Sequence, residues 1–461
     1  MDIKELKSDE LIKFIRNQIS LFEPKKADML ESINYYNYKQ DILNKKRFTI
    51  GKDGIKVIDN LPNARVIDNQ FKKAIDQKVN YLFSSLPTVK ADDPEYQKLV
   101  SNLYNKKFLR TINKIAIESY LCGISWLYVA NDNGKLSMTK MDATEIIPIW
   151  QDKNHESLEA VIRLYATSDM VNGELKTVDK LALYTDERVR VYKRESFEEI
   201  TNEGYLEAED GTYFSFDKIP FVYFKSNSSE MPLLNRVKSL QDGINSLLSN
   251  FYDNMLEDPR NQILILKNYD GEDLGEFRQK LAQYGAVKVT SSADGADGGV
   301  GTLEVHVNSE NYRLVLDLFK EKLIENAMAF DMKGYKSGTA PNELNIKSAY
   351  SDMELDAAQT LLEFSASLEY LEYFLKAVHG ITDEDKVATV SFKRNLMVNE
   401  ESVVNILNQS VGMISKKTIL SKHPFVEDVD EEIKALKDEE EEAMGDYTLN
   451  IGHDHVEEEH E

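Results

Sequence analysis

Two long amphipathic patterns separated by a short segment of mixed character constrain this sequence more than any other feature. From Leu234, apolar residues recur at three- and four-residue steps for about six turns, until Asp258 and Pro259 end the pattern. A second pattern spans Glu310 to Phe330. The residues between them alternate like strands around a short helical stretch and a glycine-rich loop. We therefore predict a small α/β module inserted between two long helices. The apolar residues expected to pack these helices are Val237, Leu240, Ile244, Leu247, Phe251, Val315, Phe319 and Leu323.

The chain before this helix pair divides into a helical part and a strand-rich part. Up to about Lys46 the apolar spacing predicts helices, with Pro24 separating two of them. Further helices are predicted before Pro87 and from about Pro94 to Leu121. From Ile124 to Phe224 the apolar period changes to two, with Asn-Gly and Asp-Glu turns between the segments. This part is predicted to be a meander of antiparallel strands.

The chain after the helix pair begins with a segment that cannot be helical throughout. Residues 331–345 are rich in glycine, serine and asparagine, and Pro341 would distort a helix. A long helix is predicted from about Ile346 to His379, followed by short helices, one of which starts at Ser415. The acidic tail beyond Asp446 is predicted to be disordered. The fold class expected from all these elements is α+β and mainly helical.

Composition limits the kind of protein this can be. The chain has 461 residues, of which 42% are apolar and 30% charged, so we expect several folded modules. The single cysteine, Cys122, lies in an apolar run and is predicted to be a buried hydrophobic residue of a protein in a reducing compartment. The N-terminus has no pattern of a secretion signal, and no apolar run is long enough to span a membrane.

The net charge of −24 argues against tight wrapping of nucleic acid. Binding to phosphates is dominated by the counterions released when lysine and arginine contact them, and here acidic residues are in excess. Any role with DNA must therefore tolerate repulsion.

Four groups of segments along the chain are informative in their order. YYNYKQDILNKK precedes VIDNQFKKAIDQKVNYLFSSLPTV, and IPFVYFKSN precedes LLNRVKSLQDGINSLLSNFYDNMLED. SGTAPNELNIKSAYSDMELDAAQ follows, and then FKRNLMVNEES with MISKKTILSKHPFVEDVDEEIKAL. In this order the segments resemble the portal proteins of tailed bacteriophages, of the long-tailed siphophage type. The likeness covers residues 30–440, although Asn342, Glu343 and Leu344 stand where family members often have a small, glycine-containing segment.

The resemblance implies a portal fold whose parts can be placed on this chain. These are N-terminal helices and wing at 1–232, stem helices at 233–257 and 309–330 with a clip at 258–308 between them, a tunnel loop at 331–345, a long wing helix at 346–380, a crown at 381–445 and the tail at 446–461. Side-by-side subunits would also bury the apolar stripes of two stem helices that a thin helical hairpin cannot bury alone.

The resemblance further implies a structural protein rather than an enzyme. It would form a ring, typically a dodecamer, at one capsid vertex of the virion, through which double-stranded DNA is packaged and ejected without sequence specificity. The implied partners are terminase and a head-to-tail adaptor at the clip, and the major capsid and scaffolding proteins. The protein would lie in the host cytoplasm during assembly, with no membrane partner and no cofactor.

The tunnel loop is the candidate DNA contact. Lys333, Tyr335 and Lys336, together with Asn342 and Asn345, could touch passing phosphates without reading bases. The alternative is an ordinary solvated loop. A channel must let DNA slide, so contacts are expected to be weak, and an acidic wall would prevent sticking.

A metal-dependent nuclease or another acidic-site DNA-processing enzyme is the alternative function. It would need carboxylates converging from separate elements. His453, His455 and His460 in the acidic tail resemble a metal tract only in residue type, and adventitious binding or none is favoured. The glycine-rich GADGGVG is followed by a strand pattern instead of a helix, so it does not fit a dinucleotide site. No GxxxxGK[ST] occurs, so ATP hydrolysis would belong to a partner.

Overall fold

The computed structural model describes most of the chain. The described residues are 3, 6–51, 54–57, 61–132, 135–171, 174–207, 213–214, 216–257, 263–267, 299–303, 309–330, 343–383, 385–394, 400–426 and 429–451. They divide into two compact units, one of residues 1–331 with 352–394 and one of residues 332–351 with 395–461.

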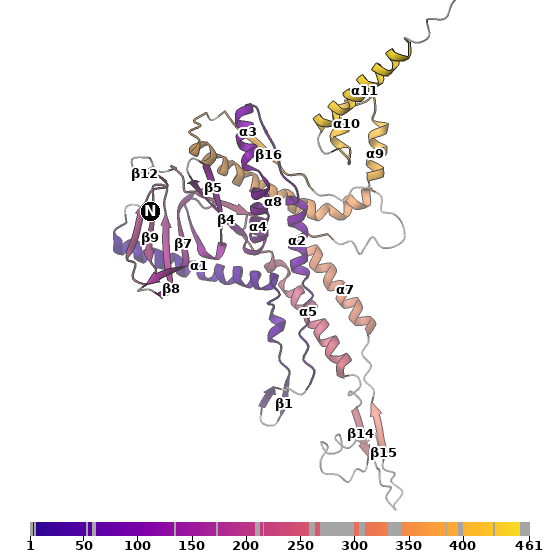
Figure 1. The fold of residues 1–461 in the computed structure, drawn as a ribbon. Coiled ribbons are helices and arrows are strands. Elements are labelled where there is room, and N and C mark those ends of the chain that lie inside the picture. Colours follow the sequence, from indigo (N-terminus) through magenta and orange to yellow (C-terminus); the bar gives the residue numbers. More distant parts are fainter. Residues whose placement is uncertain are drawn as a thin grey trace, which may run out of the picture. The chain divides into compact units, whose positions relative to one another are not determined.

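Helices are the commonest regular structure in the first unit (Figure 1). They are α1 (Ser8–Tyr36), α2 (Gln70–Phe83), α3 (Pro94–Leu103), α4 (Lys106–Cys122), α5 (Leu234–Glu257), α7 (Ser309–Asn326) and most of α8 (Glu343–Val378), with the short 3₁₀ helices η2 (Asp41–Asn44) and η3 (Ala143–Glu145).

The predicted meander is antiparallel, but it is divided between two main sheets. One sheet has the order β10-β9-β8-β7-β6 and the other the order β13-β4-β5. The strands of these sheets are β4 (Ile124–Asp132), β5 (Lys135–Met141), β6 (Ile146–Trp150), β7 (Leu158–Val171), β8 (Glu174–Tyr184), β9 (Val189–Lys193), β10 (Glu199–Glu203) and β13 (Phe221–Lys225). Two-stranded pairs are formed by β1 (Phe48–Gly51) with β2 (Gly54–Val57), β3 (Thr88–Ala91) with β16 (Ala388–Ser391), β11 (Leu206–Glu207) with β12 (Tyr213–Phe214), and β14 (Ile263–Lys267) with β15 (Gly299–Leu303). Helices and antiparallel sheets in one chain confirm the α+β class.

An aromatic core joins the long helix to the sheets. Phe364 of α8 stacks on Phe83 of α2, with the ring centroids 5.0 Å apart, and lies 5.1 Å from Phe224 of β13. Trp126 of β4 is fully buried beside Phe221 of β13. Cys122 is also fully buried, as its apolar context predicted.

The structure differs from the predicted helices in two places. Pro24 lies inside α1, which is continuous from Ser8 to Tyr36. Proline removes only one backbone hydrogen bond, and the burial of Phe22 and Met29 on either side of it holds the helix together. Conversely, the helix expected from Pro94 to Leu121 is interrupted after Leu103. The Asn105 side chain accepts hydrogen bonds from the Lys107 and Phe108 amides and starts α4.

The second unit contains α9 (Glu400–Gln409), α10 (Lys416–Lys422) and α11 (Val429–Ile451). The Ser415 side chain accepts a hydrogen bond from the Thr418 amide, which confirms the predicted helix start. Helix α11 continues to Ile451, so the prediction of disorder from residue 446 is wrong up to that residue. Residues 452–461, with the three tail histidines, lie outside the described residues.

Candidate channel segment and stem

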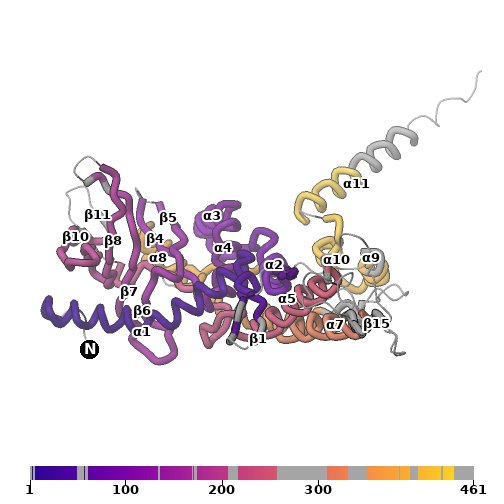
Figure 2. Tube along the Cα trace, turned by 90° about the horizontal axis from the view of Figure 1, so that it is seen from below, coloured from indigo at the N-terminus to yellow at the C-terminus, as the bar shows by residue number. Residues whose placement is uncertain are grey.

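Helices α5 and α7 form the helix pair that the sequence predicts, and they run side by side in both Figure 1 and Figure 2. We call them the stem pair. Gly243 of α5 receives the ring of Phe319, because a Cβ at this position would lie 2.5 Å from the Phe319 Cε2 atom. Nearer the insert, the rings of Phe251 and Tyr312 lie 5.0 Å apart. A side chain as small as that of glycine therefore lets the two helices approach closely.

The residues expected to pack the stem pair differ in burial. Val237, Ile244 and Leu323 are fully buried. Half-buried positions are Leu240, Leu247, Phe251, Val315 and Phe319. The stem pair alone therefore leaves part of its apolar surface accessible.

The insert between the stem helices contains an antiparallel pair of strands. In this pair of β14 and β15, Ile263 lies opposite Leu303 and Lys267 lies opposite Gly299. The predicted short helix, the glycine-rich loop and the third strand lie outside the described residues.

A polar ladder lies on the side of α5 that faces away from α7. Its members are spaced four residues apart, and each is fully buried: Gln241, Asn245, Ser249 and Asp253. Because Asp253 and Phe251 are two residues apart, they point about 160° apart around the helix. Solvent does not reach this polar face, so another part of the chain must supply its hydrogen-bond partners.

The segment that covers the polar ladder consists of residues 63–69, which we call the strap. The Ala64 amide donates to the Asp253 carboxylate at 2.6 Å, and the Val66 amide to the Ser249 hydroxyl at 2.9 Å. The Asp68 amide donates to the Asn245 side-chain oxygen at 3.0 Å. Alternate amides of an extended chain point the same way, so the strap runs antiparallel to α5 with one hydrogen bond at every second residue.

Asp253 also fixes the start of the β1–β2 hairpin. Its second carboxylate oxygen lies 2.7 Å from the Lys45 ammonium, just before β1, while its first accepts from Ala64, after β2. The Asn63 side chain donates to the Lys45 carbonyl at 3.0 Å. Both ends of the hairpin are thereby held at one point on α5.

The predicted tunnel loop is only partly covered by the structure. Lys333, Tyr335, Lys336 and Asn342 lie outside the described residues. Asn345 belongs to α8, which begins at Glu343, so the helix starts earlier than the predicted Ile346.

The chain on both sides of this loop is held by one buried lysine, Lys78 of α2. Its ammonium donates to the Met328 carbonyl at 3.0 Å, just after α7, and lies 2.6 Å from the Asp356 carboxylate of α8. Tyr120 donates to the same carboxylate at 3.2 Å, and Arg236 of α5 lies 3.7 Å from it. Burial lowers the pKa of Lys78 below its usual value, although the Asp356 charge opposes this effect. Helices α2, α4, α5 and α8 thus meet at one charged centre.

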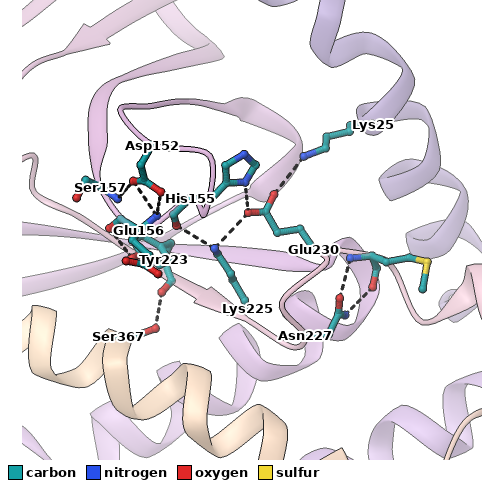
Figure 3. A network of polar contacts seen from close by, with 11 residues as sticks. Lys25, Asp152, His155, Glu156, Ser157, Tyr223, Lys225, Asn227, Glu230 and Ser367 are labelled. Atoms are coloured by element: carbon teal, nitrogen blue, oxygen red, sulfur yellow. Dashed lines mark hydrogen bonds and ion pairs between the residues drawn. The ribbon is translucent and has the colours of Figure 1, made fainter.

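A second charged centre, around Glu230, lies just before α5 (Figure 3). The buried Glu230 carboxylate lies 3.1 Å from the Lys25 ammonium of α1, 3.3 Å from the Lys225 ammonium of β13 and 2.6 Å from the His155 ring. Burial alone would raise the pKa of Glu230, but the His155 hydrogen bond and the two lysine charges lower it below the usual value. The backbone here is tight, since a Cβ on Gly123 would lie 2.1 Å from the Glu230 carbonyl oxygen.

The polar ladder and both charged centres were not predicted from the sequence. The ladder has a signal in the sequence, since four hydrogen-bonding residues recur at four-residue steps beside the apolar stripe. That spacing is equally typical of a solvated helix face. The partners of Lys78 and Glu230 are distant in sequence and leave no local signal.

The sequence matches the family described as phage portal protein, SPP1 Gp6-like, over residues 22–446. The chain belongs to this family.

Two curated relatives that match most of this chain are both named portal protein. The portal protein of Clostridium phage phiCD119 is 28% identical over 439 residues, which cover 92% of this chain and 95% of that protein. The portal protein of Bacillus phage SPP1 is 26% identical over 429 residues, which cover 89% of this chain and 83% of that protein. The resemblance identified from the sequence segments is therefore confirmed, and the family is a structural one.

Two further observations concern membrane spans and metal sites. Among the described helices, none has a stretch both long and apolar enough to cross a bilayer. Within the same described residues, no group of three or more histidine, cysteine or acidic side chains could hold a metal ion.

Proposed function

We propose that this portal protein assembles into a ring, a dodecamer by its family likeness, at one vertex of the phage capsid. The ring is the channel through which double-stranded DNA is packaged and later ejected. The family match and the order of parts support this proposal: a stem pair with a strand-containing insert, followed by a loop that leads into a long helix.

The Lys78 centre is the observation that carries the proposal furthest. A loop that touches moving DNA must yield while its ends stay fixed. Lys78 contacts the carbonyl of Met328 before the loop and the carboxylate of Asp356 after it. The force on the loop would therefore pass into the buried core of the same subunit.

Contacts with DNA are proposed for Lys333, Tyr335 and Lys336, with Asn342 and Asn345 flanking them. These contacts are weak and independent of base sequence, because cations and an aromatic ring can meet phosphates and bases of any sequence. The net charge of −24 keeps the rest of the channel from adhering to DNA.

Docking of the terminase and the head-to-tail adaptor is assigned to the insert, residues 258–308. Each strand of the β14–β15 pair has an edge that no other described strand pairs with, and such an edge can accept a further strand. The major capsid and scaffolding proteins are the remaining partners, met in the host cytoplasm during assembly.

Negative-stain electron microscopy together with sedimentation of the purified chain tests the ring. We expect large particles with a central hole, under assembly conditions if not in dilute solution. A particle no larger than a dimer under every condition, including crowded assembly mixtures, would contradict the proposal.

A deletion of Lys333 to Ser337 tests the loop. We expect rings to form and DNA packaging or retention to fall, because the ends of the loop are held independently of its middle. Substitution of Lys333 and Lys336 by alanine is the milder companion variant and should lower packaging less. Loss of rings in the deletion variant would instead assign this segment to the contact between subunits.

A further inference from the structure

The β1–β2 hairpin has an apolar face that the rest of the described chain leaves uncovered. Phe48 and Val57 are cross-strand partners, and Ile55 lies two residues from Val57, so all three share one face. Their exposed fractions are 58%, 50% and 71%. An isolated two-stranded hairpin is marginally stable in water, so a hairpin of this kind needs a surface to pack on.

The hairpin is nevertheless held in place. Asp253 contacts Lys45 at one end and Ala64 at the other, and the strap fixes the following residues along α5. Because its base is ordered before any partner arrives, a partner would lose little entropy on binding it.

A complementary surface lies on α7, on the side that faces away from α5. Leu314 and Leu318 are 68% and 46% exposed and lie one turn apart. By helical spacing, four exposed acidic side chains surround these leucines on the same face. They are Glu310, Asp317, Glu321 and Glu325, of which Asp317 and Glu325 pair with Arg313 and Lys322 of the same helix, so acidic groups are in excess by two.

The hairpin segment and the exposed face of α7 are complementary in charge, although the chain as a whole is strongly acidic. Residues 45–57 read KKRFTIGKDGIKV and contain five basic residues against one acidic residue. The hairpin segment is therefore basic in composition, with Lys45 already paired to Asp253, and the exposed face of α7 around the two leucines has an acidic excess. Such a match guides association and disfavours other partners.

The two surfaces lie on different sides of one subunit. Asp253 holds the hairpin, and Phe251, about 160° away around α5, contacts Tyr312 of α7. Two different, complementary patches on separate sides of a subunit produce a head-to-tail contact, which closes into a ring when the rotation between copies permits.

We propose that the β1–β2 hairpin packs Phe48, Ile55 and Val57 onto Leu314 and Leu318 of a second copy of this chain. The inference rests on the proposed ring and names one contact by which neighbouring copies are joined. In this contact the hairpin reaches from each subunit to the next. The contact is separate from the apolar packing between α5 and α7 within one stem pair.

Cysteine cross-linking between two different chains tests the contact. One chain carries Ile55→Cys and the other Leu318→Cys, both with Cys122→Ala, and they are mixed before assembly. We expect a covalent heterodimer in assembled rings under mild oxidation, and a series of covalent multimers when one chain carries both cysteines. Leu175→Cys, on the exposed tip of the β7–β8 hairpin, replaces Ile55→Cys in the control pair and should give no cross-link.

Ile55→Asp supplies a second measurement on the same surface. At fixed concentration we expect the fraction of chains in rings to fall about tenfold or more, since a charge replaces an apolar contact at each interface. Leu175→Asp is the matched control and should leave assembly unchanged, and circular dichroism of the monomers checks that both variants fold.

The outcomes separate the contact from the ring itself. Normal rings from Ile55→Asp, with no Ile55–Leu318 cross-link, would overturn the hairpin contact and leave the proposed function standing. A cross-link formed only within one chain would overturn it as well. Failure of the unaltered chain to form rings under any condition would contradict the proposed function and the contact together.

Discussion

The Lys78 ammonium of α2 lies 2.6 Å from the Asp356 carboxylate of α8, and both side chains are buried. Removing one member of such a pair leaves an uncompensated charge in the interior, whereas replacing both with apolar residues removes the problem. The pair is therefore a sensitive point of the first unit.

Asp356→Ala should lower the free energy of unfolding by about 3–5 kcal/mol. The double variant Lys78→Met with Asp356→Leu should recover most of this loss. Chemical denaturation measures both, and Asp352→Ala, an exposed position on the same helix, is the control. Equal losses in the single and the double variant would show that the charge of Lys78 is not what matters.

Glu230 should make stability depend on pH in the acidic range. Its pKa in the folded state is below the usual value, so its contribution is fully present above the pKa of the unfolded chain, near 4.5, and is lost as the pH falls through the folded pKa. Glu230→Gln should therefore be clearly less stable than the unaltered chain at pH 7, with the difference shrinking below about pH 4.5. Thermal unfolding across this range measures it, with the exposed Glu369→Gln as control. A difference that grows on acidification would contradict the assignment.

Asp253→Ala should release the strap and the base of the hairpin. The variant loses the Lys45 ion pair and the Ala64 hydrogen bond, which together contribute about 3 kcal/mol. Hydrogen exchange should accelerate at the Ala64 and Val66 amides. Asn250→Ala, an exposed position on α5, should change neither quantity. Unchanged exchange at both amides in Asp253→Ala would argue that the ladder does not hold the strap.

Gly243→Ala should destabilise the stem pair by about 1–3 kcal/mol, because the new Cβ collides with the Phe319 ring. Helix propensity alone would favour the same substitution by up to about 1 kcal/mol, so the two effects have opposite signs. Adding Phe319→Leu should reverse the loss in part. Calorimetry of the four chains measures the coupling, and a more stable Gly243→Ala chain would contradict the close approach.

Local sequence signals predicted the elements that local chemistry determines. Leu234 begins α5 and Ser415 starts α10 as expected, because apolar spacing and a capping hydroxyl act within a few residues. The helix break predicted at Pro24 was wrong, because the buried side chains on either side of the proline keep α1 continuous. Asn105 was missed because its capping role interrupts a pattern that otherwise continues.

The candidate sites depended on contacts between distant residues and could not be predicted. Lys78 and Asp356 are 278 positions apart, and each alone reads as a surface charge. On α5 the apolar stripe was found, but the polar ladder was not, since burial of a polar face depends on a segment far away. The expected division into portal parts rests on the family likeness alone.

The strap also limits how this protein can vary. Four residues of helix α5 rise about 6.0 Å, and two extended residues of the strap span about 6.6 Å. The two repeats therefore differ by only about 0.6 Å at each hydrogen bond. After three steps the difference approaches ~2 Å, and the extended register ends where α2 begins at Gln70, so the fourth ladder residue, Gln241, accepts from the Phe71 amide of that helix. A single inserted or deleted residue within the strap would turn its amides away from α5. Natural length variation should therefore be rare within residues 63–69.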